Sequence, residues 1–289
     1  MSVLCVGEML WDVLPKGTFL GGAPLNVAAH LARLGQESAL LSAIGDDDPG
    51  RRARRGAEAL GVNVRLLQTH QSLPTGTAHA VLDASGGAEF VIDEPVAFDA
   101  IACSAEAEIA AQTADALVFG TLAQRRSTSR ETIGKLIKLS RWRVFDPNLR
   151  APHVDPDQVM KLAAQCDLLK VNEDEGAFFG RLLDCPGTPD ALYQALRARY
   201  GLEMLCVTRG ANGAVLLTAE ERFEQPGIPV QVTDTVGAGD AFLAALIAEK
   251  LNRRLTAESL RRAAGLAAYV ATQPGAVPDY RGADFFPGK

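Results

Sequence analysis

The sequence predicts an α/β fold in which a mostly parallel central sheet carries helices on both faces, with a small β-sheet lid beside it. Short apolar runs rich in β-branched residues alternate with longer helical patterns, as strands joined by crossover helices do. One stretch, from Thr75 to Ile92, breaks that alternation, because two strand-like runs follow each other there with only a turn between them. The 289 residues are 47% hydrophobic and 22% charged, which is ordinary for a globular chain with a sizeable core.

The expected strands of the large sheet are continuous apolar runs, as buried parallel strands require. They span Val3–Gly7, Ser38–Ile44, Ala116–Gly120, Arg143–Asp146, Leu168–Asn172, Met204–Thr208 and Ala214–Thr218. The expected helices lie between these strands and have apolar residues at helical spacing. They span Ala23–Leu34, Pro49–Leu60, Ser127–Leu139, Pro156–Ala164, Asp190–Tyr200, Ala241–Leu251 and Thr256–Thr272.

The small sheet is predicted from two pieces that contain no helix. One is a hairpin with strands Thr77–Leu82 and Glu89–Ile92 around the turn Asp83–Gly87; the other is Gly7–Leu20. We expect the two pieces to pair as a lid, inserted from about residues 11–20 and 72–95 into a single domain that covers residues 1–289.

Composition argues against several classes of protein. The net charge of −6 disfavours a nucleic-acid or anionic-membrane binder, because both depend on basic surface. The five cysteines and four histidines show no metal-binding spacing, and no apolar run is long enough to span a membrane. With no signal-like start either, the expected location is the cytoplasm.

The segment Asp234-Thr-Val-Gly-Ala-Gly-Asp240 combines a glycine-rich turn with a helix start. The first N–H groups of a helix have no internal partner and lie at the positive end of its dipole, so such a corner can hold a phosphate-like anion. Asp240 beside it could take a proton from an attacking hydroxyl. An acidic residue that only caps the helix is the alternative interpretation of these residues.

Polar residues recur at the carboxyl ends of the expected strands, where open α/β sheets bind ligands. They are Glu8 and Asp12, Asn148 and Arg150, Asn172 and Glu175, and Thr208 with Gly210 and Gly213. Each could be an ordinary turn or cap, but these four ends and the glycine corner Asp234–Asp240 together favour a shared site on one edge. Asn148 and Arg150 are candidates to bind substrate there, Arg150 by contact with a sugar or a phosphate, unless it is only a surface arginine.

A second glycine-rich helix start, Gly21-Gly22-Ala-Pro-Leu-Asn26, permits close approach of a ligand to the backbone. The Asn26 amide can donate to and accept from a sugar hydroxyl, or can instead be satisfied within the protein. A P-loop motif is absent, and Gly237-Ala-Gly239 lacks the third glycine of a dinucleotide fingerprint.

These two glycine segments together closely resemble the two signatures of the ribokinase-like (PfkB) family of carbohydrate kinases, and the resemblance covers essentially the whole chain. It implies that Asp240 is the catalytic base and that Gly237, Ala238 and Gly239 form the anion hole. It implies a sugar site at Asp12, Gly21, Gly22 and Asn26. On the nucleotide side it implies Asn172, Glu175, Thr208, Gly210, Gly213 and the Gly265–Gly275 stretch.

The implied cofactors are ATP and Mg²⁺, with Glu175 acting on magnesium indirectly. A K⁺ site at Asp234 is a further expectation, although Val236 stands where potassium-dependent members often have threonine. The lid strands of this family can also form dimer interfaces, so the expected state is a monomer or a homodimer through the lid.

Within the family the chain is most similar to fructokinases, through Gly7-Glu-Met-Leu-Trp-Asp12, Gly-Gly-Ala-Pro and Phe145-Asp-Pro-Asn-Leu-Arg150. A 2-keto-3-deoxygluconate kinase is the nearest alternative; its acidic substrate should require extra cations, which residues 75–92 lack. A ribokinase or nucleoside kinase fits the pattern less well. A catalytically silent, sugar-sensing regulator on the same fold is the interpretation from outside the enzymes.

Overall fold

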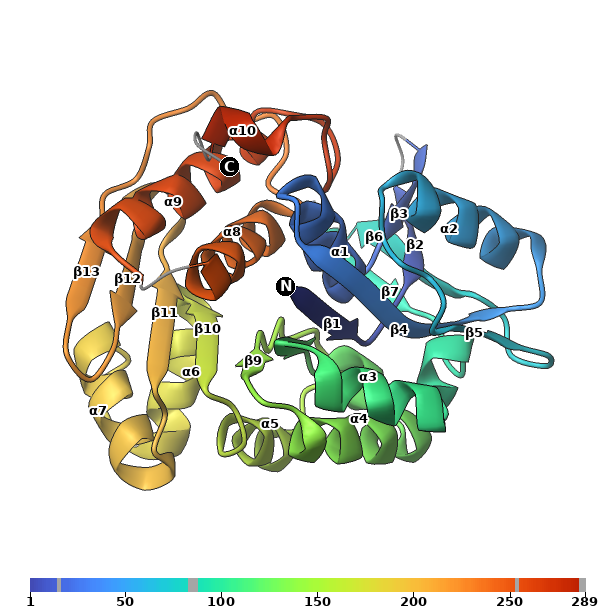
Figure 1. Cartoon of the computed structure of the whole chain (residues 1–289), viewed down its shortest axis with the longest axis horizontal. Coiled ribbons are helices and arrows are strands. Elements are labelled where there is room, and N and C mark those ends of the chain that lie inside the picture. The colour runs from blue at the N-terminus through green and yellow to red at the C-terminus, as the bar shows by residue number, and fades with distance from the viewer. Residues whose placement is uncertain (15–16, 83–87, 253–254, 286–289) are drawn as a thin grey trace.

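The computed structural model describes residues 1–14, 17–82, 88–252 and 255–285. Its large sheet has nine strands in the order β13-β12-β11-β10-β9-β8-β1-β4-β5 (Figure 1). Pairing is parallel from β5 to β11 and antiparallel at β12 and β13, which confirms the predicted mostly parallel sheet. The strands are β1 (Ser2–Val6), β4 (Glu37–Gly45), β5 (Leu67–His70), β8 (Ala116–Phe119), β9 (Arg143–Phe145), β10 (Leu168–Asn172), β11 (Met204–Thr208), β12 (Ala214–Leu217) and β13 (Arg222–Gln225).

Helices cover both faces of this sheet (Figure 1). One face carries α1 (Ala23–Arg33), α8 (Ala238–Asn252) and α9 (Ala257–Ala271). The other carries α3 (Ala105–Thr113), α4 (Ser127–Leu139), α5 (Pro156–Ala163), α6 (Glu173–Leu183) and α7 (Pro189–Tyr200). Alternate residues of β1 enter the two cores, Val3 and Cys5 on the α8 face and Leu4 and Val6 on the opposite face. The remaining helices are α2 (Asp48–Ala59), α10 (Gly282–Phe285) and three short 3₁₀ turns at Ala97–Ala100, Leu122–Gln124 and Gly210–Asn212.

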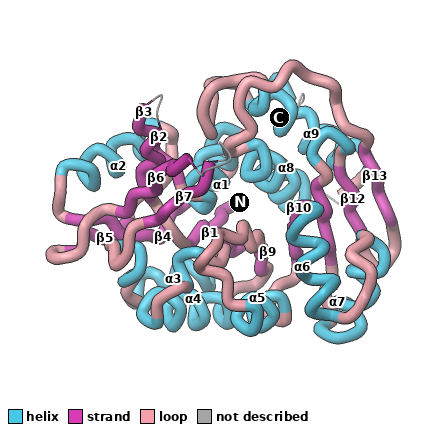
Figure 2. The backbone as a smooth tube through the Cα atoms, turned by 180° about the vertical axis from the view of Figure 1, so that it is seen from behind, coloured by secondary structure: helices cyan, strands magenta, loops and turns pink. Residues whose placement is uncertain are grey.

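The small sheet has four strands in the order β3-β2-β6-β7 and lies to one side of the large sheet, beside α2 (Figure 2). Its strands are β2 (Leu10–Leu14), β3 (Gly17–Gly21), β6 (Gly76–Leu82) and β7 (Ala88–Ile92). Strand β2 pairs with β6, which confirms that the two non-helical pieces form one sheet. The predicted turn Asp83–Gly87 lies outside the described residues.

Several elements were absent from the sequence-based assignment. Strands β5 and β13 are short and polar edge strands, so no apolar run marked them. Helix α6 begins directly at the end of β10, because Asn172 ends the strand and caps the helix. Helix α3 was also missed, and α8 begins at Ala238 rather than Ala241. The glycine corner is therefore part of the first turn of α8.

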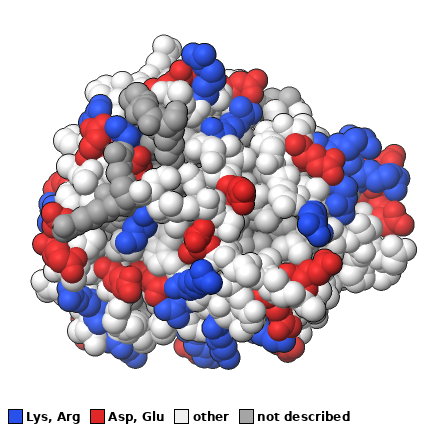
Figure 3. All heavy atoms as spheres, in the orientation of Figure 1, with Lys and Arg blue, Asp and Glu red and all other residues white. Residues whose placement is uncertain are grey.

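The surface shows mixed charge on the side seen in Figure 3, where the densest positive group lies over α2. Exposed arginines Arg51, Arg52 and Arg55 of α2 make up this group. Among the described residues no helix has both the length and the apolar character needed to cross a membrane.

Candidate active site

The glycine corner is shaped by close backbone packing. Gly237 has φ +79°, and a side chain there would collide with the backbone of Ala276 in the C-terminal segment. A side chain on Gly239 would come within 3.2 Å of the Lys170 Nζ. The start of α8 thus lies beside a buried ammonium group, and its first-turn N–H groups favour a bound anion, although that of Ala238 also donates to the Thr235 carbonyl at 3.2 Å.

Asp240 stands in the first turn of α8, between this corner and α1. Its Oδ2 accepts a hydrogen bond of 2.8 Å from the Asn26 Nδ2. Burial raises the pKa of Asp240 from 3.8 to about 6, with Lys170 and Asn26 opposing the rise. The carboxylate is therefore mostly ionised at neutral pH and still basic enough to accept a proton. The amide group of Asn26, which was predicted to bind sugar, thus also contacts the predicted base, and its role in binding sugar stays a prediction.

Lys170, which the sequence analysis missed, forms a buried ion pair beneath the corner. Its Nζ lies 2.9 Å from the Asp146 Oδ2, and both side chains are more than nine-tenths buried. Although burial alone would favour the neutral amine, nearby Asp146, Glu175 and Asp240 raise the pKa of Lys170, so it stays charged. A lysine within the apolar run Leu168-Leu-Lys-Val171 was the signal in the sequence.

The predicted sugar residues come from β2, β3 and the start of α1, with Asp12 in β2, Gly21 at the end of β3, and Gly22 and Asn26 at the start of α1. Gly21 lies against the Asp12 carboxylate and Gly22 against the Glu8 carbonyl, and a side chain at either glycine would collide. Gly22 has φ +113° and precedes α1. Burial raises the pKa of Asp12 to about 6, opposed by the positive charge of Arg150.

Arg150 belongs to this group through its charge. Burial raises the pKa of four carboxyl groups, those of Glu8, Asp12, Asp146 and Asp240, and the positive charge of the Arg150 guanidinium opposes each rise. Asn148, two residues earlier, adopts φ +45°, an uncommon conformation for a residue other than glycine. Both residues follow β9 at the carboxyl edge of the sheet, as predicted.

Two buried carboxylate oxygens at this edge have no hydrogen-bond partner within the described part of the chain. They are the Glu8 Oε2 and the Asp146 Oδ1, which flank a small pocket that Asn148 also lines. Because buried polar atoms are normally hydrogen-bonded, these oxygens suit hydroxyl donors of a ligand. Glu8 lies at a predicted strand end and Asp146 in a fructokinase-like segment, but neither was predicted to bind substrate.

Three residues predicted to lie on the nucleotide side, Asn172, Glu175 and Thr208, gather at the ends of β10 and β11. Asn172 and Glu175 form a capping box at the start of α6, and Glu175 also accepts from the Leu149 N–H at 3.0 Å. Thr208 pairs with Asn172 in the sheet register. Both Glu175 oxygens bind backbone N–H groups, so this carboxylate orients two loops.

The described residues contain no cluster of three or more acidic, histidine or cysteine side chains suited to hold a metal ion. Asp234 accepts from the Val236 N–H at 3.1 Å and so supports its own loop.

The remaining predicted glycines divide into two kinds. Gly210 and Gly213 have φ of +51° and +91°, and a side chain on Gly213 would collide with the backbone at Gln225. Gly275 has φ +82° and precedes Ala276, which packs on Gly237. Gly265 lies inside α9 with no described atom within 4 Å of its side-chain position, so the structure does not tie it to the other residues.

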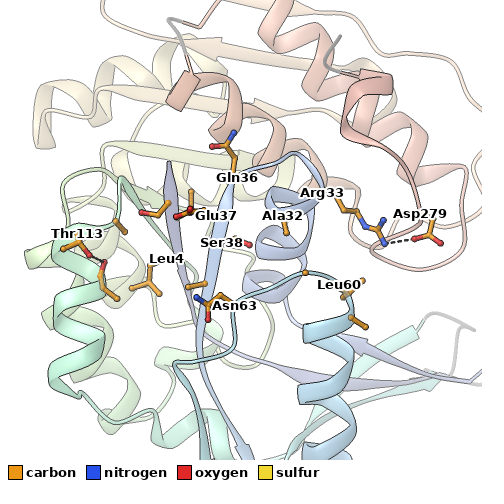
Figure 4. A pocket seen from close by; sticks show the side chains of 17 residues that line it. Leu4, Ala32, Arg33, Gln36, Glu37, Ser38, Leu60, Asn63, Thr113 and Asp279 are labelled. Atoms are coloured by element: carbon orange, nitrogen blue, oxygen red, sulfur yellow. Dashed lines mark hydrogen bonds and ion pairs between the residues drawn. The ribbon is translucent and has the colours of Figure 1, made fainter. Parts of the chain in front are cut away.

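A pocket of about 760 Å³ lies at the opposite edge of the sheet, at the amino ends of β1 and β4 (Figure 4). Its lining includes Arg33, Glu37, Asn63 and Asp279, and none of the predicted site residues. Since ligands of parallel α/β sheets bind at the carboxyl edge, this pocket is separate from the candidate active site.

A carboxylate base at the rim of an anion-binding corner is what phosphoryl transfer to a hydroxyl requires, so fold and site define a small-molecule kinase of the α/β class. Residues 17–281 match the model of the pfkB family carbohydrate kinases, and the chain belongs to that family. It is a phosphotransferase that acts on a sugar hydroxyl.

Known proteins similar to the chain include a probable fructokinase-7 from Arabidopsis thaliana, 30% identical over 96% of this chain and 88% of that protein. Aminoimidazole riboside kinase from Salmonella typhimurium is 29% identical over 96% of this chain and 91% of its own. The structure of fructokinase from Vibrio cholerae O395 with fructose, ADP and calcium ion has a TM-score of 0.84, 24% identity, and coverage of 99% and 97% of the two chains. At that identity the likeness confirms the fold.

Proposed function

We propose that the protein is a fructokinase, which transfers the γ-phosphoryl group of ATP to a hydroxyl of fructose. The observation that supports this proposal is the hydrogen bond between Asn26 and Asp240, which joins helix α1, on the proposed sugar side, to the first turn of α8, where the proposed base lies. The fructokinase relative and the similar structure that contains fructose and ADP support it.

The proposed reaction begins with fructose held between Asp12 and the Glu8–Asp146 edge. Asp240 takes the proton of the attacking hydroxyl as its oxygen bonds to the γ-phosphorus. The bond from that phosphorus to the bridging oxygen breaks, and ADP leaves with the electron pair. Negative charge on the transferring group faces the Gly237–Gly239 backbone and the Lys170 ammonium, which stabilise it without rearrangement.

ATP would lie along Thr208, Gly210, Gly213 and the Gly265–Gly275 stretch. Magnesium bound with ATP would shield the phosphate charge, with Asn172 and Glu175 ordering the loops beside it. Asp234 stays a proposed K⁺ ligand. The four-stranded sheet would act as a lid inserted in a single domain, closing over the sugar so that water does not compete as acceptor. A cytoplasmic location and a monomer or lid-mediated homodimer complete the proposal.

The charge of the sugar side favours a neutral substrate. Glu8, Asp12 and Asp240 interact with one arginine, Arg150, and Asp240 also with Lys170, while the described strands of the small sheet add no lysine or arginine. An acidic sugar such as 2-keto-3-deoxygluconate would meet more negative than positive groups there.

A substrate panel tests the proposal. Purified protein with Mg-ATP should release ADP fastest, by kcat/KM, with fructose, and more slowly with 2-keto-3-deoxygluconate, ribose and aminoimidazole riboside. A higher kcat/KM with any of the other three would overturn the choice of sugar and leave the kinase class intact.

A further inference from the structure

Helix α1 contacts the active-site corner and the C-terminal segment along one face. Asn26, His30 and Arg33 follow each other at spacings of four and three residues, so their side chains share that face. Asn26 binds Asp240, His30 binds Ala276 and Tyr280, and Arg33 pairs with Asp279 at 2.8 Å (Figure 4). Along α1, the contacts therefore run from the proposed base, Asp240, near the N-terminal end of the helix to the C-terminal segment near its C-terminal end.

His30 has a defined state in this arrangement. Its side chain is completely buried, with Nε2 2.9 Å from the Ala276 carbonyl oxygen and Nδ1 2.8 Å from the Tyr280 hydroxyl. A carbonyl oxygen only accepts, so Nε2 carries the hydrogen and Nδ1 accepts from the tyrosine. Burial lowers the pKa of His30 to about 4, so the ring is neutral at physiological pH. The two rings also stack, with centroids 5.8 Å apart.

The Ala276 carbonyl is the part of the C-terminal segment that packs on Gly237. Gly237 has no room for a side chain because the Ala276 carbonyl group occupies that space. The loop that leads into the corner is also hydrogen-bonded to the end of α9, just before the C-terminal segment, because the Thr233 and Asp234 N–H groups donate to the Ala271 carbonyl. The position of the corner backbone therefore depends on where Ala276 lies.

We propose that His30 is a positioning residue for phosphoryl transfer, which holds the Ala276 carbonyl against Gly237 and so fixes the anion-binding N–H groups at the start of α8. This inference rests on the proposed phosphoryl-transfer function. Helix α1 would therefore position both parts of the corner: Asn26 holds the Asp240 side chain, and His30 holds the Gly237 backbone through Ala276. A shift of about 1 Å at such a corner is enough to lower turnover on the order of 10²-fold.

The test compares His30→Ala, His30→Gln and Tyr280→Phe. A glutamine can keep a donor near the Nε2 position, whereas alanine removes it, and Tyr280→Phe removes only the hydroxyl that orients the ring. Ser38→Ala is the matched control, because Ser38 is buried and donates to the Ala28 carbonyl of the same helix, away from the corner.

We expect His30→Ala to lower kcat on the order of 10²-fold, while the KM for the best sugar of the panel changes little. His30→Gln should recover much of that loss, Tyr280→Phe should show a smaller loss, and Ser38→Ala should keep kcat near the wild-type value. Amide hydrogen exchange at residues 237–240 should accelerate in His30→Ala and not in Ser38→Ala.

Two results would overturn the proposal. In the first, His30→Ala keeps a near-normal kcat and a near-normal rate of amide hydrogen exchange at residues 237–240. In the second, Ser38→Ala and His30→Ala lose the same factor in kcat while they lose the same amount of stability. If His30→Ala fails to fold, Tyr280→Phe decides by the same two measurements. A wild-type protein that phosphorylates no sugar would contradict the proposed function instead, and hydrogen exchange would still decide the role of His30.

Discussion

Replacing Asp240 with asparagine separates two effects of this residue: its role as the catalytic base, and the free-energy cost of burying its negative charge. The new amide keeps an oxygen that can accept from the Asn26 Nδ2, so the local geometry should survive. Because the base is lost, kcat should fall about 10²–10⁴-fold, which is the usual contribution of general base catalysis. Turnover and stability should therefore change in opposite directions.

The stability gain follows from the pKa of Asp240, which burial raises from 3.8 to about 6. Since one pKa unit corresponds to about 1.4 kcal/mol, the folded protein disfavours the ionised form by at most about 3 kcal/mol. The folded state binds this proton more tightly than the unfolded chain, so the penalty is complete above pH 6 and disappears as the pH falls towards 4. Asp240→Asn should remove it.

Urea unfolding at pH 8 and at pH 4.5, with ADP-coupled turnover at pH 8, measures both effects. Asp240→Asn should unfold at higher urea than wild type at pH 8, and the difference should shrink at pH 4.5. Asp157→Asn is the control, because Asp157 occupies the first turn of α5 but is exposed, and it should change neither property. In the wild type, kcat/KM should fall about tenfold per pH unit below pH 6, as the base is protonated. An Asp240→Asn protein that is less stable at pH 8, or that keeps most of its turnover, would refute the reasoning.

The other predictions concern the buried ion pair and the glycines. Lys170→Met should lower the free energy of unfolding by about 3–5 kcal/mol, because it leaves the Asp146 charge unpaired. Adding Asp146→Asn should recover most of that stability in urea melts but not kcat, and recovered kcat would show that Lys170 has no part in transfer. Gly237→Ala should abolish turnover through collision with the C-terminal segment, while Gly134→Ala, in open space within α4, should raise stability by about 1 kcal/mol. Gly265 also lies in open space, so if the proposed ATP site includes it, an added methyl group in Gly265→Ala would meet the nucleotide alone. This variant should then raise the KM for ATP and leave the KM for fructose unchanged, and an unchanged KM for ATP would remove Gly265 from the nucleotide site.

The sequence predicted those parts of the fold and site that depend on local signals. Alternating apolar strands and helices indicated the large parallel sheet, and the glycines before α1 and α8 marked two corners that the structure places together. Helix α6 could not be separated from its strand, because Asn172 serves both elements and no loop residues intervene.

Contacts between distant residues account for what was missed. Lys170 and Asp146 are 24 residues apart, and His30 and Ala276 are 246 apart, so only the assembled sheet and its C-terminal segment bring these groups together. Asn26 was recognised as a site residue, but its partner, 214 residues away, could not be known. Which polar group a buried side chain binds is decided by tertiary packing.

The central claim is that Asp240 activates a fructose hydroxyl towards the γ-phosphoryl group of ATP. Phosphorus NMR of a mixture of protein, Mg-ATP and fructose tests it directly, because phosphomonoester, ADP and orthophosphate give separate signals. The wild type should convert the γ-phosphate signal into a sugar phosphomonoester with matching ADP, and Asp240→Asn should leave ATP unchanged over the same time. Orthophosphate in place of the phosphomonoester, or equal product from Asp240→Asn, would contradict the account.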